Sequence, residues 1–267
     1  MGVLPEADLI LLILLGVAFA AGLIDAIAGG GGLLTIPALL LAGLPPLTAL
    51  GTNKLQSMFG SGSACLHYAR ARHLDWRLWW PYAIVSGMAA AIGAGLAGLL
   101  SQNILAALLP FFLIAVAIWF AFWRSPPQTE VETPRLGRAA FGLSAVPTVG
   151  FYDGLFGPGT GSFFVLAFTT LRGQSLLRAT AHTKLMNFAS NIGGFAGFLA
   201  LGAVDWRIGI AMGVTQFLGA RCGAALAIKG GTWIIRPLLI VICLATAARL
   251  FSQADHPLNA LLQRLLA

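Results

Sequence analysis

Residues 22–37 read GLIDAIAGGGGLLTIP: an apolar run interrupted by one carboxylate, Asp25, and then by four glycines in succession. The run begins near Leu9 and reaches about 20 residues, the length of helix that crosses a bilayer. Glycine destabilises helix interiors, so a break in this helix is expected at Gly29, Gly30, Gly31 and Gly32. Inside hydrocarbon a broken helix is tolerated only where it is buried in protein or lines a cavity. The stretch therefore predicts a membrane protein with a break at interior depth.

The composition of the whole chain agrees with a membrane protein. Of 267 residues, 58% are hydrophobic and 9% are charged, against about 25% charged in soluble domains. The net charge of +7 does not indicate nucleic-acid binding, because the basic residues stand singly or in small groups between apolar runs, as helix-end anchors do. The histidines and cysteines show no metal-ligand spacing, and nothing indicates a metal, a cofactor or an enzyme's paired acid and nucleophile.

The first element has a counterpart in the second half, GFYDGLFGPGTGSFFV at residues 150–165. Thr52-Asn-Lys-Leu matches His182-Thr-Lys-Leu in the same way, and the Asp-Trp-Arg element at Asp75 matches that at Asp205. Pro110 matches Pro237 as well, and the matches keep their order at offsets between 127 and 130 residues. An ordered series of this kind indicates an internal duplication.

The duplication divides the chain into a first transmembrane repeat (1–123), a polar linker (124–136), a second transmembrane repeat (137–252) and an amphipathic tail (253–267). Arginines crowd the Asp-Trp-Arg loop of the first repeat but the asparagine-lysine loop region of the second. Positive loops tend to stay in the cytoplasm, so this exchange indicates inverted repeats. We expect an all-α polytopic membrane protein with an external N-terminus.

Each repeat holds four long apolar runs (8–28, 46–69, 77–100 and 103–123 in the first) and one short run (33–44, matched by 162–171). Inversion requires an odd number of crossings, so we expect five segments in each unit, with the short run forming a broken or re-entrant glycine-rich segment. The alternative is two parallel four-helix units with re-entrant loops.

The glycine breaks are candidate anion sites. Without side chains, Gly29 to Gly32 and their counterparts Gly157, Gly159 and Gly161 let backbone N–H groups approach a ligand. The half-helix after each break directs its N-terminus at the break, and that end favours anions. Hydroxyls of Thr35, Thr160 and Ser162 could add donors. The alternative is that the glycines serve only helix packing.

Lys54 and Lys184 occupy equivalent positions at the start of otherwise apolar helices. Charge within a membrane is costly, so such residues pair or serve a transport pathway. With polar neighbours Asn53, Gln56, Thr183 and Asn187, the two lysines would make an electropositive pocket for a small oxyanion. Alternatively, each lysine extends to the membrane interface.

Asp25 and Asp153 are the acidic residues deep inside apolar runs, each one turn before a glycine break. Three roles are open for them: neutralising the lysines, capping the broken helices, or carrying protons during transport. Close Asp–Lys pairs would favour a structural or proton-linked role over an anion pocket made by the lysines alone.

At residues 22–37, at Gly51-Thr-Asn-Lys-Leu-Gln-Ser57 and at the second glycine cluster, the chain resembles the sulfite exporter TauE/SafE family. The resemblance implies a multi-pass protein of the bacterial inner membrane that moves sulfite, organosulfonates or related anions. The leading interpretation is a secondary transporter of such an anion by alternating access, with the proton as a candidate coupling ion. An anion channel is the alternative, and an intramembrane enzyme is less favoured. The sequence leaves the oligomeric state open.

Overall fold

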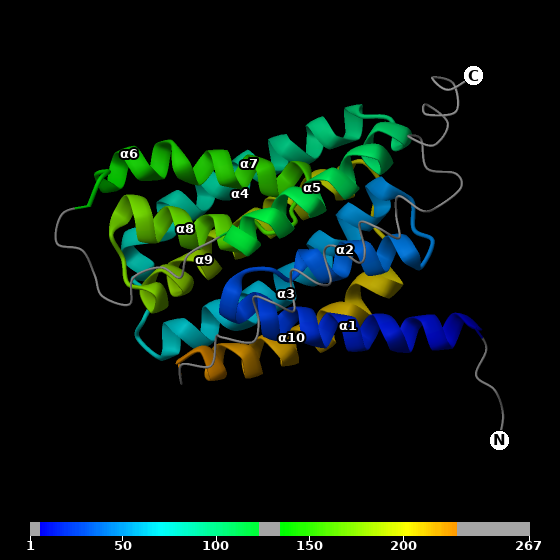
Figure 1. Ribbon diagram of the computed structural model, residues 1–267, viewed down its shortest axis with the longest axis horizontal. Coiled ribbons are helices and arrows are strands. Elements are labelled where there is room, and N and C mark those ends of the chain that lie inside the picture. The colour runs from blue at the N-terminus through cyan, green and yellow to red at the C-terminus, as the bar shows by residue number, and fades with distance from the viewer. Residues whose placement is uncertain (1–5, 123–133, 229–267) are drawn as a thin grey trace.

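The computed structural model describes residues 6–122 and 134–228, and within them every regular element is a helix (Figure 1). The first half contains α1 (Glu6–Ala28), α2 (Gly32–Leu41), α3 (Pro46–Arg70), α4 (Trp76–Leu99) and α5 (Gln102–Phe122). The second half contains α6 (Arg138–Leu143), α7 (Ala145–Leu155), α8 (Thr160–Arg172), α9 (Leu176–Ala200) and α10 (Trp206–Ile228).

The helix boundaries follow the apolar runs closely. The four long runs of the first half become α1, α3, α4 and α5, and the two short runs become α2 and α8. Three described helices are long and apolar enough to cross a membrane: α1 from Asp8, α4 and α10. Residues 124–133 of the expected linker and the expected tail at 253–267 lie outside the described residues.

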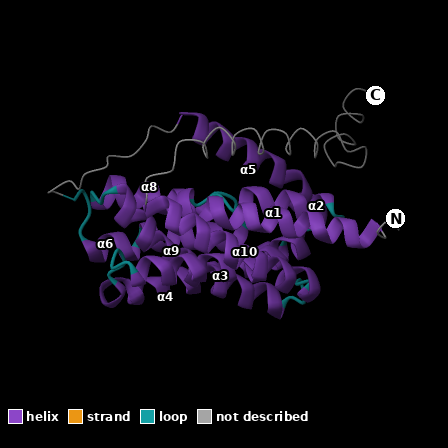
Figure 2. Ribbon diagram, turned by 90° about the horizontal axis from the view of Figure 1, so that it is seen from below, coloured by secondary structure: helices purple, strands orange, loops and turns teal. Residues whose placement is uncertain are grey.

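The helix pair α3 and α9 lies at the centre of the bundle, and Figures 1 and 2 show the long helices side by side around it. These two helices run antiparallel, since Lys54 lies against Gly194 whereas Gly62, further along α3, lies against Phe188. On one side α10 packs against α3 and α1, and on the other α4 packs against α9 and α7. Each half thus packs mainly on elements of the other.

Small residues allow these close helix contacts. A Cβ at Gly22 would collide with the carbonyl of Gln216, and one at Gly219 would collide with Phe19, so α1 and α10 touch backbone to backbone. Gly87 of α4 and Gly193 of α9 meet in the same way. Because the tails of lipids are as apolar as the helix surfaces, such close packing is a main source of helix association in membranes.

The ends of the central helices are fixed by equivalent contacts between the halves. The backbone N–H of Asp205 donates to the hydroxyl of Thr52 at 2.9 Å, and that of Asp75 donates to Nε2 of His182 at 3.2 Å. The two aspartates differ in their side-chain contacts: the Asp205 carboxylate accepts from the N–H of Ile208 at 2.9 Å, as a helix cap does, whereas the Asp75 carboxylate binds Arg178 at 2.8 Å.

Candidate functional site

The first helix is broken where the glycines stand. Helix α1 ends at Ala28, Gly29 takes a φ of +81°, and α2 begins at Gly32. A positive φ suits glycine because in other residues the Cβ would crowd the backbone carbonyl there. The sequence expectation of a break at this point is therefore met by backbone geometry as well as by helix ends.

The second half is broken at the equivalent place. Helix α7 ends at Leu155, Gly157 and Gly159 take φ values of +89° and +78°, and α8 begins at Thr160. Pro158, which lies between these two glycines, accepts a hydrogen bond on its carbonyl from the Tyr152 hydroxyl at 2.7 Å. The proline therefore takes part in the turn between the two helices.

The two breaks touch each other. A Cβ added at Gly29 would collide with the backbone of Gly161, and one added at Gly161 would collide with the backbone of Gly29. The Ser162 hydroxyl donates to the carbonyl of Ala28 at 2.5 Å, which gives an acceptor at the end of α1 a partner from α8. Residues more than 130 positions apart in the chain, Ala28 and Ser162, thus meet at one partly buried junction.

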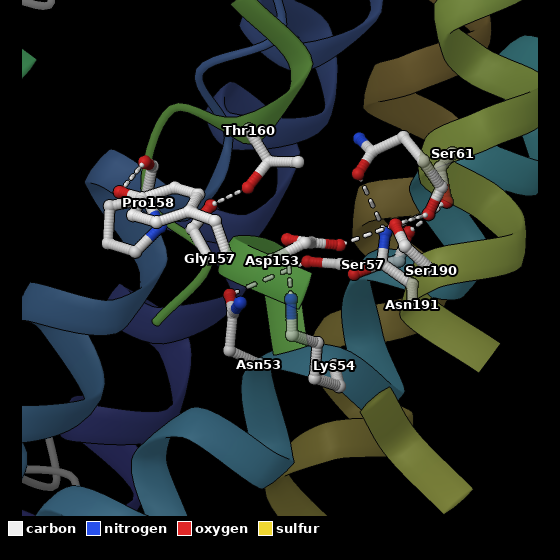
Figure 3. Close-up of polar contacts among 12 residues, drawn as sticks. Asn53, Lys54, Ser57, Ser61, Asp153, Gly157, Pro158, Thr160, Ser190 and Asn191 are labelled. Atoms are coloured by element: carbon white, nitrogen blue, oxygen red, sulfur yellow. Dashed lines mark hydrogen bonds and ion pairs between the residues drawn. The ribbon is translucent and has the colours of Figure 1, made fainter. Parts of the chain in front are cut away.

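Beside this junction the charged residues pair across the two halves. Nζ of Lys54, on α3, lies 2.6 Å from Oδ1 of Asp153 on α7 (Figure 3). Nζ of Lys184, on α9, lies 3.0 Å from Oδ2 of Asp25 on α1 and also donates to the Asp25 carbonyl. Both lysine side chains are at most 1% exposed. Each lysine is thus partnered by the aspartate of the other half.

Further donors complete the surroundings of each carboxylate. The Ser190 hydroxyl donates to Oδ2 of Asp153 at 2.5 Å. Oδ1 of Asp25 accepts from the N–H of Gly31 at 3.3 Å, just before α2 begins. Buried charges are stable when they are paired and hydrogen-bonded, as both carboxylates are here. The Asp25 carboxylate therefore contacts both the ammonium of Lys184 and the N–H of Gly31, one residue before α2.

A small polar cavity of about 20 Å³ lies between the pairs, enough for about one water molecule. The N-terminal residues of two broken half-helices line it, Gly32 of α2 and Thr160 of α8. The remaining lining residues carry carboxylate, amide or hydroxyl groups or are glycines: Asp25, Gly29, Asn53, Ser57, Asp153, Gly157, Gly161, Asn187 and Asn191.

Hydrogen bonds join the sequence-predicted residues at and around the cavity. Asn53 is the centre of one such group: its Oδ1 accepts from the Thr35 hydroxyl at 2.6 Å and from Nε2 of Gln56 at 3.1 Å. The Thr160 hydroxyl bonds the Gly157 carbonyl at 2.8 Å. Three further predicted residues are buried but do not line the cavity: Gly30, Gly159 and Thr183. Each lies within four positions of a lining residue in the sequence.

The sequence reasoning missed two lining residues, Ser57 and Asn191. Ser57 follows Asn53 by four residues and Asn191 follows Asn187 by four, so each lies one turn along the same helix face as a predicted residue. That spacing was the available signal. Nδ2 of Asn191 also donates to Ser61 at 3.3 Å, which joins α9 to α3 beside the cavity.

The electrostatics differ from the expected electropositive pocket. Two lysines and two aspartates form two ion pairs, so the formal charges within the site cancel. The carboxylates line the cavity, whereas the ammonium groups lie behind them. The site therefore consists of two ion pairs with no net formal charge, beside a small polar cavity that two helix N-termini face.

Buried ion pairs at the junction of two broken apolar helices define an integral membrane protein with an enclosed polar site. Comparison with known proteins identifies the class: the profile of the sulfite exporter TauE/SafE family matches residues 14–250. The chain belongs to this family of membrane transporters and is not an enzyme.

Several curated relatives match over most of their length. A "Probable membrane transporter protein ORF9" of Sinorhizobium is 52% identical over 91% of this chain and 92% of the relative. A "Probable membrane transporter protein" of Haemophilus influenzae is 44% identical over 90% and 94%. "Probable membrane transporter protein YfcA" of Escherichia coli K12 is 42% identical over 91% and 90%. No solved structure matches the chain significantly.

Proposed function

We propose that this protein is a secondary transporter of a small oxyanion, in the class of sulfite and organosulfonates, across the bacterial inner membrane. The observation that carries the proposal is the crossed pairing of Lys54 with Asp153 and Lys184 with Asp25 around a polar cavity. The printed description of the family, sulfite exporter, supports the choice of anion.

The cavity offers the groups that bind oxyanions. The N-termini of α2 and α8 open on it, and such ends carry partial positive charge. Amides of Asn53, Asn187 and Asn191 add donors that suit a small anion with several oxygens. Binding would require the cavity to widen, because its present volume of about 20 Å³ corresponds to about one water molecule.

Charge balance links the anion to a proton. While both ion pairs are intact the site is formally neutral, and burying an additional negative charge there is costly. Protonation of Asp25 or Asp153 would leave one lysine without a counter-charge, and an anion could then take the place of the lost carboxylate. The anion and the proton would enter together, which makes proton-coupled symport the mechanism that the geometry favours.

The alternating movement would use the two halves as inverted repeats. The antiparallel packing of α3 on α9, and the exchange of partners in which α1 packs on α10 as α7 packs on α4, support this arrangement. The proposal includes a multi-pass topology with five segments in each half, and cytoplasmic placement of the arginine-rich loops would put the N-terminus outside. Rocking of one half against the other would expose the site between α3 and α9 to each side in turn.

Uptake into proteoliposomes tests the function. Labelled sulfite, sulfate and a short sulfonate would be compared in wild type, Lys54→Ala and Lys184→Ala, at two pH gradients. We expect saturable flux of one of these anions, accelerated by unlabelled anion on the opposite side and lost in both variants. Flux that is not saturable would indicate an anion channel. Flux unchanged by both substitutions would overturn the proposed site.

A further inference from the structure

A second cavity lies on the outer face of the bundle, and its lining differs in character from that of the charged site. It is a groove of about 460 Å³ between α4 and α9, and its lining is almost entirely apolar. This volume falls within the range of about 300–1,000 Å³ typical of small-molecule sites. Trp76, Trp80, Ile84 and Met88 line it from α4 as a row at every fourth residue, and each is between 48% and 63% exposed. Leu185, Phe188 and Ile192 line it from α9.

The groove exists because two parallel helices touch along a line of small residues. Both helices begin at the same end, where the N–H of Asp75 bonds His182, and Gly87 meets Gly193 further along. The larger side chains stand on either side of this line and form the walls.

At the corresponding interface between α3 and α10 an aromatic ring packs against the partner helix. A Cβ at Gly213 of α10 would lie 2.7 Å from the ring of Phe59 on α3, so that ring covers the glycine. Phe59 corresponds to Ala189 at the offset of 130 residues, and Ala189 lines the open groove. The aromatic ring of Phe59 at the α3–α10 interface is therefore replaced by the methyl group of Ala189 at the α4–α9 interface, where the groove lies.

One end of the groove is basic and aromatic. Arg77 follows Trp76 in the sequence, and the exposed Arg178 bonds the carboxylate of Asp75, the residue before Trp76. Arg70, the last residue of α3, and Arg72, in the connection that leads into α4, are both exposed. Arg77 and Arg178 therefore stand next to this end with one aspartate, Asp75, and Arg70 and Arg72 lie within six residues of Trp76 in the sequence. Tryptophans with arginines beside them are typical of the membrane–water interface.

We propose that this groove binds an anionic phospholipid, with an acyl chain between α4 and α9 and the phosphate at Arg77 and Arg178. The apolar groove suits the acyl chain of such a lipid, and the guanidinium groups at its end suit the anionic headgroup. Arginine forms strong, forked hydrogen bonds to phosphate oxygens. A lipid bound there would contact both halves of the chain, because α4 belongs to the first half and α9 to the second.

The charge distribution favours a lipid over a second copy of the chain as the occupant. Copies inserted in a membrane in the same orientation would bring their arginine-rich ends to the same level. A groove-to-groove contact would therefore place like charges side by side, which is unfavourable. An anionic headgroup at that level is attracted instead.

Quenching of tryptophan fluorescence by brominated lipids tests the proposal without any transport assay. The full-length protein would be placed in phosphatidylcholine nanodiscs containing, at one fixed mole fraction, either brominated phosphatidylglycerol or brominated phosphatidylcholine. Trp80→Phe identifies the part of the signal that comes from the groove. We expect phosphatidylglycerol to quench that part preferentially, and Arg77→Gln to reduce the preference about fivefold, the order expected for one arginine at an anionic surface.

Two further variants control the result. Arg207→Gln removes the arginine of the other Asp-Trp-Arg element and should leave the preference unchanged. Ala189→Phe, which copies Phe59, should abolish the groove signal; if that variant does not fold, the exposed Arg77 still provides the test. Equal quenching by both lipids, or equal effects of Arg77→Gln and Arg207→Gln, would overturn the proposal. So would a wild-type dimer that Ala189→Phe converts to a monomer in light scattering.

Discussion

The ammonium of Lys54, in the first half of the chain, lies 2.6 Å from the carboxylate of Asp153 in the second half. The equivalent residues pair in the opposite sense, Lys184 with Asp25 at 3.0 Å. Each half therefore supplies one cation and one anion, and each of these charged groups finds its partner in the other half. The charged site is built by both halves together. Relative motion of the halves would change the distances within both ion pairs.

The Lys54–Asp153 pair can be tested as a unit through protein stability. Lys54→Met should lower the free energy of unfolding by about 3–5 kcal/mol, because it leaves a buried carboxylate without its partner. The double variant Lys54→Met, Asp153→Asn should regain most of that loss. Thermal unfolding in detergent would measure both. Additive losses in the double variant would show that the two groups do not interact in the folded protein.

The pH dependence of transport tests the role of Asp25. Protonation of a carboxylate becomes more favourable as the pH falls, so coupled uptake should rise as the pH of the compartment that supplies the proton is lowered. Asp25→Asn imitates the protonated group permanently and should flatten this profile, since no proton is then needed at that position. The initial rate of anion uptake at a series of external pH values is the measurement. A wild type whose rate is independent of pH would contradict proton coupling.

Gly29 and Gly32 provide a matched pair for the contact between the helix breaks. Gly29→Ala should destabilise the protein by about 2–5 kcal/mol, because a Cβ is strained at positive φ and would collide with Gly161. A Cβ at Gly32 would lie 3.6 Å from its nearest neighbour, the Gly157 carbonyl oxygen, an ordinary contact. Gly32→Ala should therefore change stability by less than about 1 kcal/mol. Similar losses in the two variants would argue against the close contact.

The contact at Thr52 can be isolated with nearly isosteric substitutions. Thr52→Val removes the acceptor of the Asp205 N–H and should cost about 1–3 kcal/mol of stability. Thr52→Ser keeps the hydroxyl and should cost less. The equivalent comparison at the other end is His182→Thr against His182→Val, because His182 accepts from Asp75. If valine and the hydroxyl-bearing residue behaved alike at both positions, these hydrogen bonds would contribute nothing measurable.

Local features of the site were predictable from the sequence because they depend on residues near one another. Four successive glycines mark the end of α1, and the apolar run after them marks α2, which begins at Gly32. The membrane class followed from composition and from helices α1, α4 and α10, which are long and apolar enough to cross.

The pairing of the charges was not predictable in the same way. Lys54 and Asp153 are 99 positions apart, and Lys184 and Asp25 are 159 apart. No local pattern indicates which aspartate reaches which lysine, since the pairing depends on how the halves pack. The direct contact between each lysine and an aspartate, and with it the case for a coupled proton, appears only when both halves are in place.

The most direct test of the account measures anion and proton movement together. Proteoliposomes loaded with a pH-sensitive dye would receive an inward gradient of the transported anion, and protein-free liposomes would give the background. A short sulfonate is the preferred anion, because it stays ionised and carries no proton by itself. We predict internal acidification that accompanies anion uptake in wild type and disappears with uptake in Lys54→Ala. Anion uptake by wild type with no proton movement would contradict the account.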